Sequence, residues 1–201
     1  MAPRIFNPDI RAAILGLEGV PWSFMPRAAD ADHFKVSTVP PTLGADKANS
    51  VTSFTVANCP GAPVVPVLVF VDNAADDLSS IVATITGTDQ FGEIVQDTAG
   101  GLKATYDSGG AWTIPFHVAF RKITSLVFTV LGTTLSGDRY TLGFAKTYGL
   151  LRRIDAATDV IADFNGAVDA GTAETVYNTY AIAGTPDALK VLTLLVSPSG
   201  N

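Results

Sequence analysis

Apolar and polar residues alternate in several short runs of this sequence, and that alternation restricts the chain to strand-rich folds. Successive side chains of a strand point to opposite faces, so a period of two predicts a strand with one buried face. In residues 113–121 the predicted buried set is Ile114, Phe116, Val118 and Phe120, and the opposite set is Pro115, His117, Ala119 and Arg121. Residues 51–57 alternate in the same way, and so do residues 139–145 with Tyr140, Leu142 and Phe144.

Two apolar runs, at residues 64–71 and 126–131, have the length of buried strands. We expect them to be central strands covered on both faces. Turn-forming residues separate these runs, and little helical periodicity occurs. The sequence therefore predicts an all-β fold, an antiparallel β-sandwich or barrel-like body, with residues 51–147 as its main domain.

The stretch ATITGTDQFGEIVQDT, at residues 83–98, contains either a ligand site or a plain hairpin. Residues 81–86 and 93–98 have strand character, and Gly87 and Gly92 bracket a short polar loop. The tip of this loop carries Asp89, Gln90 and Phe91. We interpret the stretch as a structural hairpin, with Phe91 packed on the sheet or on a partner.

Residues 1–50 contain prolines throughout and predict an extended arm. One short amphipathic helix is expected at residues 9–17, with Asn7 or Asp9 as its N-cap. The arm is too apolar to remain exposed to water, so it must pack on its own body or on a neighbour. We expect it to bind a partner through large apolar side chains: Ile5, Phe6, Ile10, Ile14, Trp22 and Phe24.

Residues 148–201 contain three more strand-like runs, at residues 159–166, 175–182 and 189–197. Asn165 and Gly166 form a dipeptide typical of a two-residue hairpin turn. This small C-terminal β segment is either a subdomain or a set of strands added to the main sheets.

Charged residues make up 16% of the chain, against about 25% in ordinary soluble domains, which predicts burial against other subunits and a homo-oligomer. The net charge is −6, and no lysine or arginine occurs between Lys47 and Lys103. Such acidity opposes nucleic-acid binding, because phosphate recognition needs clustered cations. No apolar run reaches the roughly 20 residues of a membrane-spanning helix, so no membrane partner is expected.

The sequence contains no motif for catalysis or for a cofactor, neither a phosphate-binding loop nor a nucleophile elbow. Cys59, the only cysteine, has no adjacent basic residue to activate a thiolate. His33 and His117 stand in unrelated contexts, and we expect His117 at the surface or at an interface. The acidic turn at residues 72–77 lacks the spaced oxygens of a calcium loop. We therefore expect no catalytic, cofactor-binding or metal-binding residues and no enzymatic activity.

Three stretches resemble structural proteins of tailed-bacteriophage virions: TGTDQFG at residues 86–92, GLLRRIDAATDVIADFNGAV at residues 149–168, and ALKVLTLLVS at residues 188–197. The N-terminal MAPRIFNPDIRAAILG is similar in character. The resemblance covers about half of the chain, and its motifs carry no catalytic residue.

The resemblance implies a capsid decoration, or cement, protein on the head surface of the virion. Its partners would then be the major capsid protein and copies of itself. A neck, adaptor or tail protein of the same virion is the alternative. The residues alone leave a third possibility, a carbohydrate-binding β-sandwich module with Trp22, Tyr106, Trp112 and Tyr140 as its aromatic platform.

Overall fold

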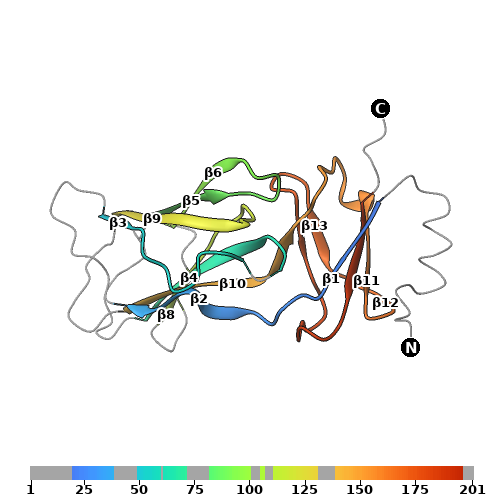
Figure 1. The fold of residues 1–201 in the computed structure, drawn as a ribbon, viewed down its shortest axis with the longest axis horizontal. Helices are drawn as coiled ribbons and strands as arrows, with labels where there is room; N and C mark the ends of the chain where they lie inside the picture. Colours follow the sequence, from blue (N-terminus) through green and yellow to red (C-terminus); the bar gives the residue numbers. More distant parts are fainter. Residues whose placement is uncertain are drawn as a thin grey trace.

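A computed structural model of the chain describes residues 20–38, 49–59, 61–71, 82–100, 105–106, 111–130 and 139–196. In these residues the fold is all-β, as the sequence predicts: the strands pair antiparallel, and the helical structure is one 3-10 turn at Ala157–Asp159. The strands form three sheets, which we call the hairpin sheet, the long sheet and the terminal sheet (Figure 1).

The hairpin sheet contains the predicted hairpin of residues 83–98. Its strand order is β3 (Asn49–Val51), β9 (Lys122–Val130), β5 (Val82–Thr88) and β6 (Ile94–Gly100). β5 and β6 pair in continuous register from Val82–Gly100 to Thr88–Ile94. Both strands begin within one residue of their predicted starts.

The long sheet is centred on β10 and curls into half a barrel. Its order is β13 (Thr172–Glu174), β14 (Thr179–Ala181), β10 (Arg139–Gly149), β4 (Val64–Val71), β8 (Ala111–Pro115) and β7 (Thr105–Tyr106). A seventh strand, β2 (Asp30–Thr38), also pairs with β10. β10 pairs with different strands along its length, and its pairing with β2 and with β4 contains register shifts.

The terminal sheet joins the two ends of the described chain. Its order is β1 (Val20–Phe24), β15 (Leu192–Val196), β11 (Val160–Phe164) and β12 (Ala167–Val168). Asn165 and Gly166 form the turn between β11 and β12, as predicted. This sheet stands at one end of the described part of the molecule (Figure 1).

Aromatic side chains from the long sheet and the hairpin sheet meet in the main core. The Phe128 ring of β9 lies 5.7 Å from the Phe70 ring of β4 and 5.2 Å from the Tyr140 ring of β10. All three side chains are at most 1% exposed. The predicted inward set of β10, Tyr140, Leu142 and Phe144, is buried here as well. The two sheets therefore form a sandwich with one continuous core.

The C-terminal segment takes both of the roles that the sequence left open. Strands β11, β12 and β15 form a separate sheet with β1, whereas β13 and β14 extend the long sheet by pairing with β10. In residues 175–182 only Thr179–Ala181 form a strand, because residues 175–178 make the turn between β13 and β14.

The described part of the predicted arm is strand and belongs to the body. Residues 20–24 are β1, an edge strand of the terminal sheet, and residues 30–38 are β2 of the long sheet. Prolines 21 and 26 permit this arrangement, since Pro21 lies in an edge strand and Pro26 in the connection that follows. Sequence periodicity missed both strands because their partners, β15 and β10, are more than 100 residues away.

The strand predicted at residues 113–121 is too long. β8 ends at Pro115, whose nitrogen cannot donate a ladder hydrogen bond. Ile114, Phe116 and Phe120 are buried as predicted, but Ala119 is also fully buried and Val118 is only half-buried. The alternation is therefore lost after the strand ends, where two consecutive residues, Ala119 and Phe120, are both buried.

Residues 51–57 are also not the continuous strand that their alternation predicts. Only Val51 belongs to β3, and the rest of the segment is irregular. The amide of Thr55 donates to the Phe34 carbonyl, and the Ala57 carbonyl accepts from Ile123. Because these backbone bonds go to two different sheets, the segment crosses between sheets and joins neither ladder.

Strand β9, which contains residues 126–130 of the apolar run predicted at 126–131, is covered on one face only. Its buried side chains are Ile123, Leu126 and Phe128, whereas Thr124 and Thr129 are exposed. The expectation of burial on both faces was wrong for this run, because β9 lies in a sheet that contacts the core with a single face.

Candidate functional site

The hairpin tip at residues 89–93 is held by the carboxylate of Asp89. Its Oδ1 accepts the backbone amides of Phe91 (2.8 Å) and Glu93 (2.9 Å), and the Asp89 amide donates to the Glu93 carbonyl (2.9 Å). Gly92 adopts a φ of 86°, which favours glycine. Asp89 is only 9% exposed. Its role is therefore to fix the loop, as the structural interpretation of this hairpin predicts.

The hairpin lies close against the start of β9 at Gly87, next to its tip. A Cβ on Gly87 would lie 2.1 Å from the Lys122 carbonyl oxygen and 2.7 Å from the Phe120 ring. Only glycine permits this approach of the two backbones. The tip is thus displayed on a rigid support.

Gln90 lies between two clefts and lines both of them. One, of about 680 Å³, also includes Trp22, Cys59, Arg121 and Lys122, and we call it the Trp22 cleft. The other, of about 410 Å³, includes Phe91, Val118, Ile154, Val176 and Tyr177, and we call it the Phe91 cleft. The Gln90 Oε1 atom is buried and makes no hydrogen bond with a described residue.

The Trp22 cleft brings together two groups that the sequence proposed separately, the arm and the hairpin tip. Trp22 is half-buried and stacks on Phe24, with ring centroids 4.4 Å apart, and the Phe24 ring lies 5.1 Å from Tyr148. Both arm residues therefore pack partly against the core of their own chain. Ile5, Phe6, Ile10 and Ile14 lie outside the described residues.

Cys59, on the wall of the Trp22 cleft, carries an unreactive thiol. The thiol donates to the Phe120 carbonyl, and burial raises its pKa to about 12. At neutral pH the thiolate is therefore scarcely populated.

The Phe91 cleft carries exposed apolar side chains. Phe91 is 45% exposed and Val176 is 76% exposed, and both line the cleft. Ile94, three residues after Phe91 on the same hairpin, is 81% exposed. We call these three residues the hairpin-tip surface. Phe91 was expected to pack on its own sheet or on a partner, and at 45% exposure it packs only partly on its own chain.

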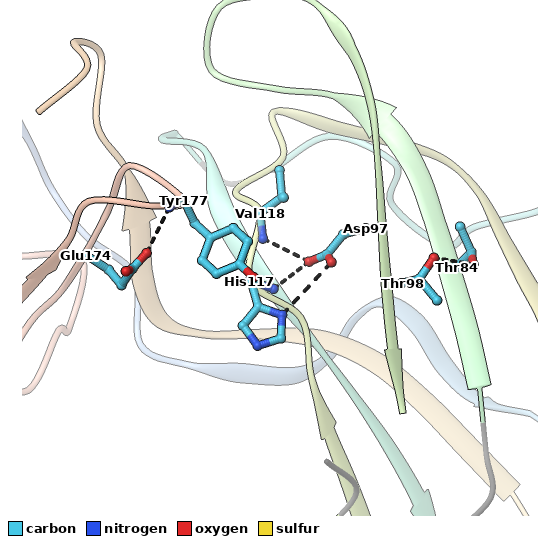
Figure 2. Close-up of polar contacts among 7 residues, drawn as sticks. All are labelled: Thr84, Asp97, Thr98, His117, Val118, Glu174 and Tyr177. Carbon is cyan, nitrogen blue, oxygen red and sulfur yellow. Dashed lines mark hydrogen bonds and ion pairs between the residues drawn. The ribbon is translucent and has the colours of Figure 1, made fainter. Parts of the chain in front are cut away.

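Asp97, His117 and Tyr177 connect the sandwich to the C-terminal segment (Figure 2). The buried Asp97 carboxylate accepts the backbone amides of His117 and Val118, and its Oδ1 lies 3.9 Å from His117 Nδ1. The His117 ring packs on the Tyr177 ring, with centroids 4.9 Å apart and planes inclined by 30°. Glu174 in turn accepts the Tyr177 amide at 2.8 Å.

The geometry around His117 is that of a structural contact. Within the described residues its ring makes no hydrogen bond to a serine, threonine or cysteine side chain that it could activate. The ring is about one quarter exposed and lies between two parts of the fold. The alternation in the sequence predicted only which face of the strand His117 occupies. No local signal could have predicted its contact with Tyr177, which is 60 positions further along the chain.

His33 is also held by structural contacts. Its Nδ1 lies 3.6 Å from the Asp30 carboxylate, its Nε2 lies 3.3 Å from the Asn58 carbonyl, and its ring packs on Phe34 and Phe144. In the described ranges, no group of three His, Cys, Asp or Glu side chains could hold a metal ion. The acidic turn at residues 72–77 lies outside those ranges.

Comparison of the chain with protein-family models, with curated proteins and with solved structures found no match. A search of the described residues for a helix long and apolar enough to cross a membrane found none. The functional proposals below therefore rest on the residues and on the geometry given above.

Proposed function

We propose that the chain is a non-enzymatic structural protein of a tailed-phage virion, a decoration or cement protein that bridges neighbouring capsomers on the head. The resemblance of TGTDQFG and of the two C-terminal stretches to such proteins supports this function. The low charge content supports it too, because a protein with few charged residues gains by burying part of its surface against other subunits.

The hairpin-tip surface is the observation that carries the proposal. Phe91 and Val176 expose large apolar side chains on one cleft, and Ile94 is exposed three residues further along the hairpin. Apolar side chains gathered at the surface mark interaction sites in soluble proteins. The tip is fixed by Asp89, so little conformational entropy is lost when a partner covers it. A rigid apolar surface of this kind is suited to binding a partner rather than to catalysing a reaction.

A bridging subunit stabilises a capsid by burying apolar surface on both sides of a seam. Each Å² removed from water contributes about 25 cal/mol before the costs of association are subtracted. Because the subunit binds only the assembled particle, its binding free energy opposes disassembly. The effect increases with occupancy and reaches a plateau when the sites are filled.

Two exposed valines of the C-terminal segment provide a matched test of this surface. Val176 lines the Phe91 cleft, whereas Val168, 62% exposed, lies in β12 of the terminal sheet. Val176→Asp should reduce binding to particles stripped of the chain at least tenfold, and Val168→Asp should leave it within twofold. Equal binding by both variants and the unchanged chain would exclude the hairpin-tip surface as the binding site.

The alternative positions in the virion predict a different number of copies. A cement protein is expected in hundreds of copies per particle, and a neck or adaptor ring in about a dozen, as the resemblance implies. Quantitative mass spectrometry of purified particles distinguishes the two.

The carbohydrate-binding alternative loses support because its aromatic residues are divided between the core and two sheets. Tyr140 is 1% exposed in the main core, so it has no face for a sugar. Trp22 lies in the terminal sheet and Trp112 in the long sheet. The side chain of Tyr106 is outside the described part of the structure.

A further inference from the structure

The Trp22 cleft differs in charge from the chain as a whole. Two charged side chains of the described residues line it, Arg121 and Lys122, and both are cationic. No described aspartate or glutamate lines it, although the net charge of the chain is −6. The Phe91 cleft, by contrast, is lined by charged side chains of both signs. Of the two clefts, the Trp22 cleft is therefore the one suited to a negatively charged ligand.

Neither cation of the Trp22 cleft is neutralised by another described residue. Arg121 and Lys122 are both exposed. Within the described ranges, the Arg121 guanidinium and the Lys122 ammonium make no ion pair and no hydrogen bond, whereas Lys190 lies 3.1 Å from the Asp187 carboxylate. No described group thus competes with a ligand for the two charges, and the low-dielectric walls of a cleft concentrate their field.

Backbone hydrogen bonds hold the walls of this cleft in place. The Arg121 amide donates to the Thr88 carbonyl at 2.7 Å, and the Arg121 carbonyl accepts from the Cys59 amide at 3.0 Å. Pro63, which also lines the cleft, accepts from the Gly149 amide at 3.0 Å. Because three segments far apart in sequence are joined at Arg121, the cleft is formed before a ligand arrives, and little conformational entropy is lost on binding.

Apolar side chains line the same cleft as the two cations. Trp22 is half-buried and Leu151 is 43% exposed, and both are part of the lining. The volume of about 680 Å³ lies within the range of ligand clefts, roughly 300–1,000 Å³. A small inorganic anion would leave the apolar lining without a contact. A peptide with both carboxylate and apolar side chains makes use of both kinds of lining.

We propose that the Trp22 cleft binds an acidic peptide segment of a partner protein. A carboxylate of the segment accepts hydrogen bonds from the Arg121 guanidinium, whose planar group matches a carboxylate, and it lies near the Lys122 ammonium. An apolar side chain of the segment packs on Trp22 and Leu151. A nucleic acid fits less well, because its phosphates need a larger cluster of cations. This site is separate from the hairpin-tip surface and does not depend on the proposed function.

Two short capped peptides test the class of ligand. One alternates aspartate with leucine, and the other carries asparagine in place of every aspartate. In ¹H–¹⁵N spectra of the full chain, the aspartate peptide should shift the Trp22 indole signal and the amide signals of Arg121 and Lys122 until they saturate. The asparagine peptide should bind at least tenfold more weakly. Equal affinities, or no saturable shift at these signals, would overturn the proposal.

Matched charge variants locate the site. Arg121→Gln and Lys122→Gln should each weaken binding of the aspartate peptide at least threefold, and both should fold normally because the side chains are exposed. Arg139→Gln removes the same charge from an exposed position at the start of β10, which does not line this cleft, and should change the affinity less than 1.5-fold. An equal loss in all three variants, or no loss in either cleft variant, would exclude the cleft as the binding site.

Inorganic phosphate and an oligothymidine strand test the competing kinds of ligand. Each is added to the chain saturated with the aspartate peptide, and the signals of the cleft report displacement. Both should bind at least tenfold more weakly than the peptide. Tighter binding of either one would assign the cleft to phosphate groups and refute an acidic peptide as its ligand.

Discussion

The β5–β6 hairpin and the terminal sheet differ in how far apart in sequence their partners lie. The hairpin pairs Val82 with Gly100 and encloses a tip that its own carboxylate, Asp89, holds together. The terminal sheet pairs β1 with β15, and its Ser23–Thr193 hydrogen bond spans 170 positions. The hairpin can therefore form from residues that are close in sequence. The terminal sheet can form only when strands from both ends of the described chain meet.

The two regions therefore differ in structural role. The hairpin presents an apolar surface on a rigid support, as a binding element requires. The terminal sheet fastens the first described strand to the last one. Changes in the terminal sheet should consequently affect global stability, whereas changes at the exposed tip should affect binding.

The largest effect is expected in the terminal sheet. Leu194→Ala empties a fully buried site and should lower the free energy of unfolding by about 2–5 kcal/mol. Leu189→Ala, at a position 83% exposed, is the control and should be nearly neutral. Urea denaturation followed by circular dichroism measures both variants, and a neutral Leu194→Ala would remove the terminal sheet from the cooperative unit.

A smaller loss is expected at the hairpin tip, where Asp89→Ala removes the acceptor of two backbone amides. We expect a cost of about 2–3 kcal/mol, within the range for hydrogen bonds to a charged group. Asp89→Asn retains a carbonyl acceptor and should lose less than half as much. Equal losses in the two variants, measured by denaturation, would contradict the role given to this carboxylate.

High pH should weaken the junction between the terminal and long sheets. Tyr148 donates to the Arg27 carbonyl at 2.9 Å, and burial raises its pKa above the usual tyrosine value. The pKa of Tyr180 is raised by burial and by its hydrogen bond to Asp169. Because the folded chain favours the neutral phenols, stability is full below about pH 10, the unfolded pKa, and falls as the pH rises towards the folded values.

The variant Tyr148→Phe provides the control for this pH dependence. It loses one hydrogen bond, about 1 kcal/mol, and should show a shallower fall in stability above pH 10. Denaturation midpoints at a series of pH values measure the slope. An unchanged slope in Tyr148→Phe would mean that this phenol does not contribute to alkaline unfolding.

The smallest effect is expected for His117→Ala, which removes the ring contact with Tyr177. The cost should stay below about 1.5 kcal/mol, since the ring is partly exposed and aromatic pairs contribute about 0.5–1.5 kcal/mol. The backbone amide of residue 117 still donates to Asp97 in this variant. A loss as large as that of Leu194→Ala would show that the Asp97–His117–Tyr177 contact is part of the main core.

The sequence predicts the local parts of the fold well. Two strand-like runs bracketed by Gly87 and Gly92 identified the hairpin, and alternation identified the inward set of β10, because both signals depend on neighbours in sequence. It missed β1 and β2, whose pairing is decided by strands far along the chain. It also extended β8 past Pro115, to His117 and Val118, whose amides donate to the Asp97 carboxylate rather than to a ladder partner.

The sequence identified the hairpin-tip residues of the candidate site, but not the residues that the fold brings next to them. Asp89, Gln90 and Phe91 were identified as the tip, and the structure gives each a separate role: holding the loop, lining two clefts, and exposing an apolar ring. Val176 and Tyr177 could not be found from the sequence, because only the folded chain brings them to the hairpin. Trp22 meets Gln90 for the same reason.

We propose that this chain stabilises a particle by binding it, and the temperature of genome release tests this proposal most directly. Particles stripped of the chain are reconstituted with increasing amounts of it, and DNA release is followed by dye fluorescence during heating. We expect a release temperature that rises with occupancy, reaches a plateau at saturation, and stays at the bare-particle value with Val176→Asp. A release temperature that is the same for bare and saturated particles would contradict it.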